Sequence, residues 1–213
     1  MLCNEITIES LSGKCIAIDA FNMIFQFLST IRGRDGSLLK DGHGGVTSHL
    51  IGLFSRTTHL MLVGVQPVFV FDGKAPVLKQ KEQARRSAVK KEAEKEYEKA
   101  VEKGDVGSMR KFAARSIYLD ESMIGDAKKL ISLLGLPVVQ APSEGEAQAA
   151  HIVKNGDAWA VGSQDYDSLV HGASRLIQNL SITGKRKNPK TLVYKTVSPE
   201  LLELKKNLDL LGI

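Results

Sequence analysis

Acidic side chains that follow short apolar runs are the residues of this sequence best suited to carry chemistry. They are Asp19, Asp72, Glu144, Glu146, Asp165 and Asp167. Carboxylates gathered at one place raise one another's pKa, so they either take up protons or hold cations between them. Oxygen ligands favour the hard ions Mg²⁺ and Mn²⁺ over zinc. A carboxylate cage for two such ions is typical of phosphodiester hydrolysis, because one ion activates water and the other stabilises the departing oxygen.

Each acid also has an ordinary structural interpretation. Asp19 or Asp72 alone would serve as a helix N-cap or as a turn residue. The sequence from Ser143 to Glu146 fits the S-x-x-E capping box, which needs no chemistry. For a single residue these uses are commoner than catalysis. Acids after every apolar run together favour a common purpose.

The apolar runs that precede the acids must position them. These runs are CIAI (15–18), VFVF (68–71), LPVV (136–139) and AWAV (158–161). They are continuous rather than alternating, which predicts strands covered on both faces. Segments with helical spacing lie between them. Strand and helix in alternation predict an α/β sandwich with a mainly parallel central sheet, whose strands have their carboxyl ends along one crevice.

Three further patterns complete the predicted elements. One apolar stripe predicts a helix that ends near Gly135, a residue suited to a C-cap; the stripe consists of Met123, Ala127, Leu130, Ile131 and Leu134. Two later runs, RLIQNL (175–180) and TLVYKTV (191–197), are expected to add edge strands.

One charged segment does not fit the core. Residues 79–103 read KQKEQARRSAVKKEAEKEYEKAVEK, which is rich in good helix formers and has no Gly or Pro. We interpret it as a helical excursion of about residues 74–118 that stands off the sheet, because it has few apolar residues to bury. Between residues 79 and 91 the charges are basic except for Glu82. The alternative is a solvated helix with i,i+4 pairs such as Glu82–Arg86.

The overall charge agrees with an acidic partner. The chain of 213 residues carries a net charge of +5, and the loop GKRKNPK (184–190) adds to its basic surface, although a solvated loop is an equal alternative. No apolar run is long enough to span a membrane, and the first residues lack the order of a signal peptide. Cys3 and Cys15 have no metal-ligand spacing and are expected to be free thiols in a reducing compartment.

Six segments together resemble the flap endonucleases of the structure-specific 5′-nuclease, or XPG-type, family, most closely the archaeal type. They follow in order through essentially the whole chain and are IAIDAFNMIFQFLSTIR, TSHLIGLFSRT, VFVFDGKAP, APSEGEAQAA, SQDYDSLVHG and LSITGKRK. The resemblance implies a PIN-like three-layer α/β fold. It also implies two Mg²⁺ ions, for which Mn²⁺ can substitute, and a 5′ flap endonuclease and 5′–3′ exonuclease activity in DNA replication and repair.

The resemblance further implies roles for single residues. The six acids match the family's metal-site carboxylates. Lys79 and Arg86 match a basic pair in a helical arch that contacts the scissile phosphate, and their spacing of seven puts them on one helix face. Phe25 stands where the family has a tyrosine that stacks on a base, and a phenyl ring keeps that stacking face. Arg32 and Arg56 lie in matching segments and would contact phosphates.

The sequence departs from the family pattern at both ends. It starts beyond the family's Met-Gly segment, and it stops before a helix with a seventh acid, a helix–hairpin–helix element and a peptide that binds the sliding clamp. We therefore expect residues 1–213 to be a 5′-nuclease core that lacks the C-terminal helix–hairpin–helix part. Such a core should hold one ion well and the second weakly, and cut slowly on its own.

The expected partner is branched DNA with a 5′ flap, and the sliding clamp would be a partner only of a full-length protein. We expect a monomer that binds no membrane and is intracellular, or cytoplasmic if archaeal. Two alternatives stay open at this point. One is a PIN-type ribonuclease with the same acid cage, and the other is a catalytically weak DNA-binding fragment that needs a further C-terminal segment.

Overall fold

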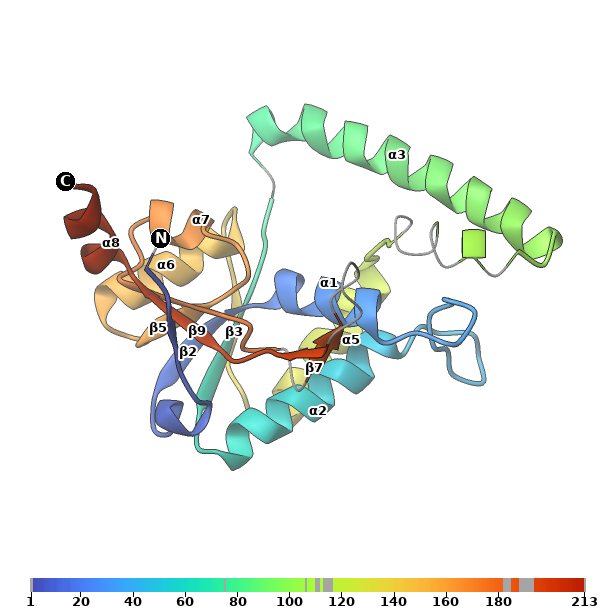
Figure 1. The fold of residues 1–213 in the computed structure, drawn as a ribbon. Coiled ribbons are helices and arrows are strands. Elements are labelled where there is room, and N and C mark those ends of the chain that lie inside the picture. The colour runs from blue at the N-terminus through green and yellow to red at the C-terminus, as the bar shows by residue number, and fades with distance from the viewer. Residues whose placement is uncertain are drawn as a thin grey trace. The chain divides into compact units, whose positions relative to one another are not determined.

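The computed structural model describes residues 2–74, 76–105, 107–109, 112, 117–181, 185–187 and 194–212 (Figure 1). Its strands are β1 (Asn4–Glu5), β2 (Cys15–Asp19), β3 (Gln66–Phe71), β4 (Val138–Gln140), β5 (Ala160–Gly162), β6 (Arg175–Gln178), β7 (Lys185–Lys187), β8 (Tyr194–Thr196) and β9 (Glu200–Glu203). Its helices are η1 (Glu9–Leu11), α1 (Ala20–Thr30), α2 (Ser48–Leu62), α3 (Val77–Glu102), α5 (Glu121–Leu133), α6 (Gly145–Asn155), α7 (Asp167–Val170) and α8 (Leu204–Leu211).

The chain divides into two compact units. The first contains Met1–Met23, Arg56–Gly73 and Gly135–Ile213, and the second contains Ile24–Ser55 and Lys74–Leu134. A seven-stranded sheet in the order β1-β9-β6-β5-β2-β3-β4 lies in the first unit, which also holds the separate β7-β8 pair. Helices α1 and α2 each begin in one unit and end in the other.

The strands predicted from the four apolar runs are confirmed. Strands β5, β2, β3 and β4 are neighbours in that order, and each pair is parallel. Ile16, Ile18, Phe69 and Phe71 are fully buried. Side chains that alternate with them, such as Ala17 and Val70, are buried in a cluster with residues of helix α6, so both faces of these strands are covered. Continuous apolar sequence is therefore what these central strands require. The predicted α/β class with a mainly parallel sheet is correct.

The two predicted edge strands are corrected by the structure. The run RLIQNL forms β6, but β6 lies between β5 and β9 rather than at an edge. Part of TLVYKTV forms β8, which pairs with β7 outside the main sheet, and residues 191–193 lie outside the described residues. The outer strands β9 and β1 run antiparallel to their neighbours and were not predicted. Both are short and carry charged residues, so they show no continuous apolar run.

The predicted helix before Gly135 is confirmed as α5. The Asp120 side chain accepts a hydrogen bond from the Met123 amide over 2.8 Å and caps its start. Met123, Ala127 and Ile131 form its buried face. The backbone of Gly135 then adopts φ +75°, a left-handed conformation that glycine reaches without steric cost.

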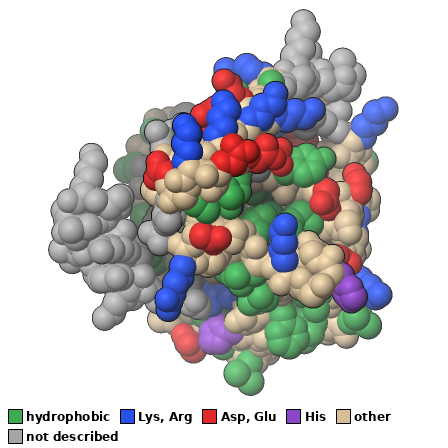
Figure 2. Space-filling view, turned by 90° about the vertical axis from the view of Figure 1, so that its right-hand side faces the viewer, with side chains coloured by type: hydrophobic (Ala, Val, Ile, Leu, Met, Phe, Trp, Pro, Cys, Tyr) green, Lys and Arg blue, Asp and Glu red, His purple; other side chains and the backbone are tan. Residues whose placement is uncertain are grey.

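The charged segment forms the continuous helix α3 in the second unit, as predicted. It buries small side chains such as Ala93 and Ala100. Figure 2 shows basic and acidic side chains next to one another on one face of the molecule, and on α3 Lys99 pairs with Glu96 over 2.6 Å. No helix among the described residues is long and apolar enough to cross a membrane. Cys3 and Cys15 are free thiols, as expected.

Candidate metal centre

All six predicted acids lie in the first unit, near the carboxyl ends of parallel strands. The positions in chain order are the last residue of β2 (Asp19), the residue after β3 (Asp72), the N-cap and second residue of α6 (Glu144, Glu146), the loop after β5 (Asp165) and the first residue of α7 (Asp167). Parallel strands that run side by side carry their carboxyl ends to the same end of the sheet. The structure therefore brings the acids to one end of the sheet.

The strand register places these ends almost level with one another. Asp19 lies opposite Val70 of β3, and the preceding Ile18 lies opposite Gly162 at the end of β5. On the other side, Phe71 of β3 lies opposite Gln140 at the end of β4. Each segment that carries an acid therefore follows a strand that ends at nearly the same level of the sheet.

The loop after β3 is joined closely to the start of α6. The Gly145 amide donates to Asp72 Oδ1 over 2.6 Å, and the Gly73 amide donates to the Ser143 carbonyl over 2.6 Å. A Cβ atom at Gly73 would lie 2.1 Å from the Ala141 carbonyl oxygen, and one at Gly145 would lie 2.7 Å from Asp72 Oδ1. Glycine is therefore required at Gly73, where the close atom is a backbone oxygen, whereas a side chain at Gly145 would push away the Asp72 carboxylate.

The capping-box interpretation of Ser143 and Glu146 is wrong. The N-cap residue of α6 is Glu144, and it makes no side-chain capping hydrogen bond. Asp72 instead receives the first amide of the helix from across the loop. The negative charge of Asp72 thus lies at the N-terminus of α6, where the unpaired backbone amides and the helix dipole favour an anion.

Asp19 caps a helix, as its ordinary structural interpretation predicts, and it also lies among the other acids. One carboxylate oxygen, Oδ1, accepts from the Asn22 amide over 3.0 Å and so caps the start of α1. The other, Oδ2, accepts from Ser163 Oγ over 3.3 Å. Asp19 is 5% exposed, and this burial raises its pKa to about 6, with a further contribution from Asp72 and Asp165 that the two hydrogen bonds oppose.

Glu146 is the residue around which the other carboxylates gather. Partial burial raises its pKa to about 7, and repulsion from neighbouring carboxylates contributes. The neighbours are, in order of effect, Asp19, Asp167, Asp165 and Asp72. The remaining acid, Glu144, has its Oε2 atom 3.8 Å from Nε2 of His171. Negative charge is therefore concentrated at Glu146 to a degree that disfavours its ionised form.

The donors fit hard divalent cations in an open arrangement. Within the described part of the chain, no three acidic, histidine or cysteine side chains form a finished coordination sphere. Mg²⁺ is usually held through only one or two carboxylates, with waters and substrate phosphates as its other ligands. Oxygen donors spread around Glu146 fit ions of this kind, and burial together with repulsion raises the pKa of Glu146 and of Asp19.

The predicted phosphate-binding residues lie in different surroundings. Lys79 is exposed on α3, whereas the side chain of Arg86 lies outside the described residues. Lys90 Nζ lies 5.0 Å from the centre of the Phe25 ring, so a cation covers the ring that was predicted to stack on a base.

The two arginines bind backbone carbonyls. Arg32 donates to Leu28 over 2.8 Å and to Gly36 over 2.7 Å. Arg56 is 4% exposed, and its Nε and a terminal nitrogen both donate to the Leu180 carbonyl. Burial lowers the pKa of Arg56 to about 10. A phosphate contact stays a prediction for both, and the burial of Arg56 argues against it.

Sequence reasoning missed the polar residues that hold the acids. Asn22 and Ser163 both contact Asp19, and each also contacts the loop that carries Asp165. The available signals were the spacing of three between Asp19 and Asn22 and the place of Ser163 directly after β5. Both are common polar residues, so neither signal distinguishes a supporting role from an ordinary turn.

The fold and the acids define an α/β protein with a group of carboxylates near the carboxyl ends of parallel strands. The model of the XPG N-terminal domain matches residues 2–93, and the model of the XPG I-region matches residues 135–213. These two matches cover most of the chain, and the chain belongs to the XPG family.

The relatives are archaeal flap endonucleases. The flap endonuclease 1 of Thermofilum pendens is 53% identical over 212 residues, which are 100% of this chain and 61% of the relative. That of Pyrococcus abyssi is 54% identical over 209 residues, or 98% of this chain and 61% of the relative. The chain thus spans less than two thirds of the length of these relatives.

A solved structure agrees with the fold. The flap endonuclease-1 structure from Methanococcus jannaschii matches with a TM-score of 0.73 and 43% identity, over 100% of this chain and 64% of that one. The catalytic core of Rad2 in complex with a DNA substrate matches with a TM-score of 0.68 and 27% identity, over 99% of this chain and 54% of that one. The PIN-like α/β fold that the resemblance implied is confirmed.

Proposed function

We propose that this chain is the nuclease core of a divalent-metal-dependent 5′ flap endonuclease, which hydrolyses DNA phosphodiester bonds and leaves a 5′-phosphate and a 3′-hydroxyl. The observation that carries the proposal is the concentration of carboxylates around Glu146 at the carboxyl ends of β2, β3 and β5. The names of the relatives and the DNA bound in the Rad2 structure support a branched DNA substrate. A protein of positive net charge suits such a substrate.

The acids would hold Mg²⁺ or Mn²⁺, two ions in the active state. When bound, these ions activate water and neutralise the charge that develops on the phosphate and on the departing oxygen. Asp72, anchored to the start of α6, and Asp19, anchored to the start of α1, present their oxygens from fixed positions. Glu146 would give up the proton that its raised pKa retains near neutral pH, because a cation replaces the proton in relieving the repulsion.

Residues of the second unit would bind the nucleic acid. We propose that α3 forms part of a helical arch of about residues 74–118, in which Lys79 and Arg86 contact the scissile phosphate. Phe25 would stack on a base next to the cleaved bond once Lys90 gives way, since stacking on an aromatic face is independent of base identity. Lys90 would then contact a phosphate.

Metal binding tests the centre without any need for cleavage. Millimolar Mn²⁺ or Mg²⁺ should raise the melting temperature of the metal-free chain, because an ion at 100 times its Kd stabilises by about 2.7 kcal/mol. The double variant Glu146→Gln/Asp165→Asn should lose the rise. An absent shift, or an equal shift in the double variant, would mean that these acids hold no metal.

Cleavage tests the substrate class. A 5′-flap DNA and a single-stranded RNA of matched length, incubated with the chain and Mg²⁺ or Mn²⁺ under single-turnover conditions, separate a flap nuclease from a PIN-type ribonuclease. We expect cutting at the flap junction, no cutting of the RNA, and loss of activity in Glu146→Gln. Faster cutting of the RNA, or undiminished cutting by the variant, would overturn the proposal.

A further inference from the structure

One asparagine at the start of α1 connects two of the acidic segments. The backbone amide of Asn22 donates to Asp19 Oδ1 over 3.0 Å. Its side-chain Nδ2 donates to Asp165 Oδ2 over 3.0 Å, and its Oδ1 accepts from the Gln164 amide over 3.3 Å. Asn22 therefore contacts Asp19 through its backbone amide. Its side chain contacts both the carboxylate of Asp165 and the backbone amide of Gln164.

The loop from Ser163 to Asp165 is also held from other sides. Ser163 Oγ donates to Asp19 Oδ2 over 3.3 Å and accepts from the Asp165 amide over 3.2 Å. On β6, Gln178 Nε2 donates to the Gln164 carbonyl over 2.7 Å. Because these contacts fix the backbone, the side chain of Asn22 acts on the direction of the Asp165 carboxylate itself.

The chemistry of this contact requires an asparagine. A short side-chain amide offers a donor and an acceptor side by side, and the contact uses both. Aspartate would present a negative charge to Asp165, which disfavours two ionised carboxylates at that distance. Alanine would remove both hydrogen bonds and leave the carboxylate of Asp165 to rotate.

We propose that Asn22 is a positioning residue of the metal centre, which holds the carboxylate of Asp165 in the direction that a divalent cation needs. The inference rests on the proposed function, since it assumes that the acids bind metal. Residues that hydrogen-bond to a metal ligand fix its orientation, and their removal usually costs about 10–100-fold in metal affinity.

Mn²⁺ affinity of the metal-free chain, measured by calorimetry, tests this role in the wild type, Asn22→Ala, Asp165→Asn and the double variant. We expect Asn22→Ala to weaken binding about tenfold or more. In the Asp165→Asn background the same change should have little effect, because the ligand through which Asn22 acts is already altered. Such non-additivity is the signature of two residues that act as a pair.

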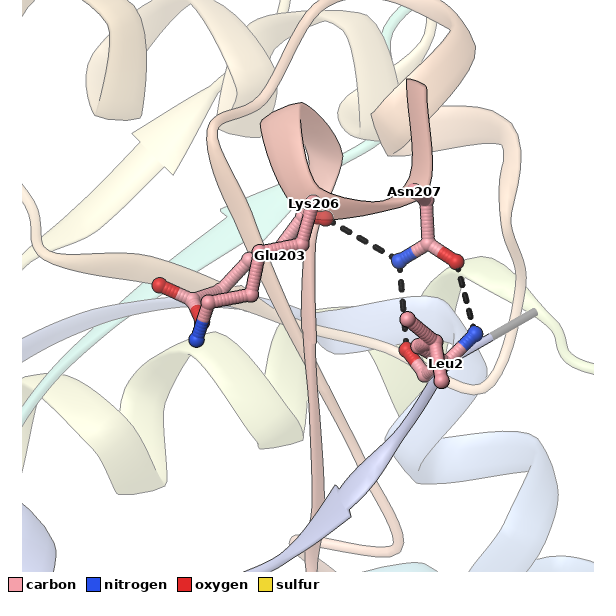
Figure 3. A network of polar contacts seen from close by, with 4 residues as sticks. All are labelled: Leu2, Glu203, Lys206 and Asn207. Carbon is pink, nitrogen blue, oxygen red and sulfur yellow. Dashed lines mark hydrogen bonds and ion pairs between the residues drawn. The ribbon is translucent and has the colours of Figure 1, made fainter. Parts of the chain in front are cut away.

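Asn207 offers a matched control in the same unit (Figure 3). Its Nδ2 donates to the carbonyls of Leu2 over 3.1 Å and Glu203 over 3.0 Å, and its Oδ1 accepts from the Leu2 amide over 2.8 Å. Asn207→Ala therefore also removes an asparagine that uses both ends of its amide. We expect it to lower the melting temperature and to leave Mn²⁺ affinity unchanged.

The outcomes are distinguishable. Equal Mn²⁺ affinity of wild type and Asn22→Ala, or effects of Asn22→Ala and Asp165→Asn that simply add, would overturn the role of Asn22 and leave the metal centre intact. A wild-type chain that binds no Mn²⁺ would overturn the proposed centre and this inference with it. If circular dichroism shows that Asn22→Ala is unfolded, Asn22→Leu, which keeps most of the volume, undergoes the same titrations and decides in its place.

Discussion

Asp72 accepts a 2.6 Å hydrogen bond from the amide of Gly145, although 73 positions separate the two residues in the sequence. The bond ties the end of β3 to the start of α6, and it is possible only because neither Gly73 nor Gly145 carries a side chain at this crossing. The geometry of a carboxylate in the proposed metal centre thus depends on two glycines that have no chemistry of their own.

Substitution of Gly73 tests that dependence. A Cβ atom there would lie 2.1 Å from a backbone oxygen, which cannot rotate away as a side chain would. We expect Gly73→Ala to lower the free energy of unfolding by about 1–3 kcal/mol, as overpacking does, and to weaken Mn²⁺ binding by displacing Asp72. Denaturant unfolding and calorimetry measure the two effects.

Gly125, on the exposed side of α5, is the matched control for that substitution. A Cβ atom at Gly125 would meet nothing within 4 Å. Gly125→Ala should therefore stabilise the chain by up to about 1 kcal/mol, the difference in helix propensity. Equal stability of the two alanine variants would show that the end of β3 and the start of α6 are less closely packed than described.

The pH dependence of stability should reveal the strain at Glu146. Its pKa is raised from 4.5 to about 7 in the folded chain. Between these pH values the folded state binds more protons than the unfolded state, so stability falls as the pH rises through this window. Glu146→Gln cannot ionise and should gain stability over the wild type at pH 8 but not at pH 4.

Thermal melts of the metal-free protein in a chelator measure this difference. Because Glu146 is only half-buried, water screens part of the repulsion, and we expect a gain of a few degrees at pH 8. Glu98→Gln, at an exposed position of α3, is the control and should show no such gain. A gain that is the same at pH 4 and pH 8 would count against an ionisation effect.

We expect substitution of Arg56 to reduce the stability of the fold rather than to act directly on DNA binding. Arg56 is buried and donates twice to the Leu180 carbonyl. Arg56→Ala leaves that buried carbonyl without these donors and should cost about 1–3 kcal/mol of unfolding free energy. Lys205→Ala, at an exposed position of α8, should cost almost nothing. Unchanged stability of Arg56→Ala, with weaker binding of flap DNA, would restore the phosphate contact predicted from the sequence.

The arch role of Lys79 makes a kinetic prediction. If Lys79 acts on the transition state, Lys79→Ala should lower the single-turnover cleavage rate by about 10²-fold, as for other charge-stabilising groups, with little loss of DNA affinity. Lys99, which pairs with Glu96, should affect only affinity and its salt dependence. Equal behaviour of Lys79→Ala and Lys99→Ala would favour the solvated-helix interpretation.

The sequence sufficed to predict the parallel centre of the sheet and the place of the acids. Strands β2, β3 and β5 are covered on both faces, so their apolar runs are continuous, and the acids after them follow from strand direction alone. The antiparallel strands β1 and β9 escaped prediction, because short strands with charged residues gain their order from neighbours already in place.

The supporting contacts of the site could not be predicted for a related reason. Asn22 and Asp165 are 143 positions apart, and their hydrogen bond depends on side-chain directions that are set only when β2 and β5 pair. Likewise, the apparent capping box before α6 is a local pattern, whereas in the structure Glu144 is the N-cap residue and the first amide of the helix donates to the distant Asp72.

The position of β2 between β3 and β5 has a consequence for folding during synthesis of the chain. On the ribosome, Asp19 emerges well before β5 and Asp165, and the parallel pairings that join these segments are non-local. A nascent chain therefore holds its acids on separate, unpaired segments. The cluster of acids is thus not assembled until β5 has emerged and paired with β2.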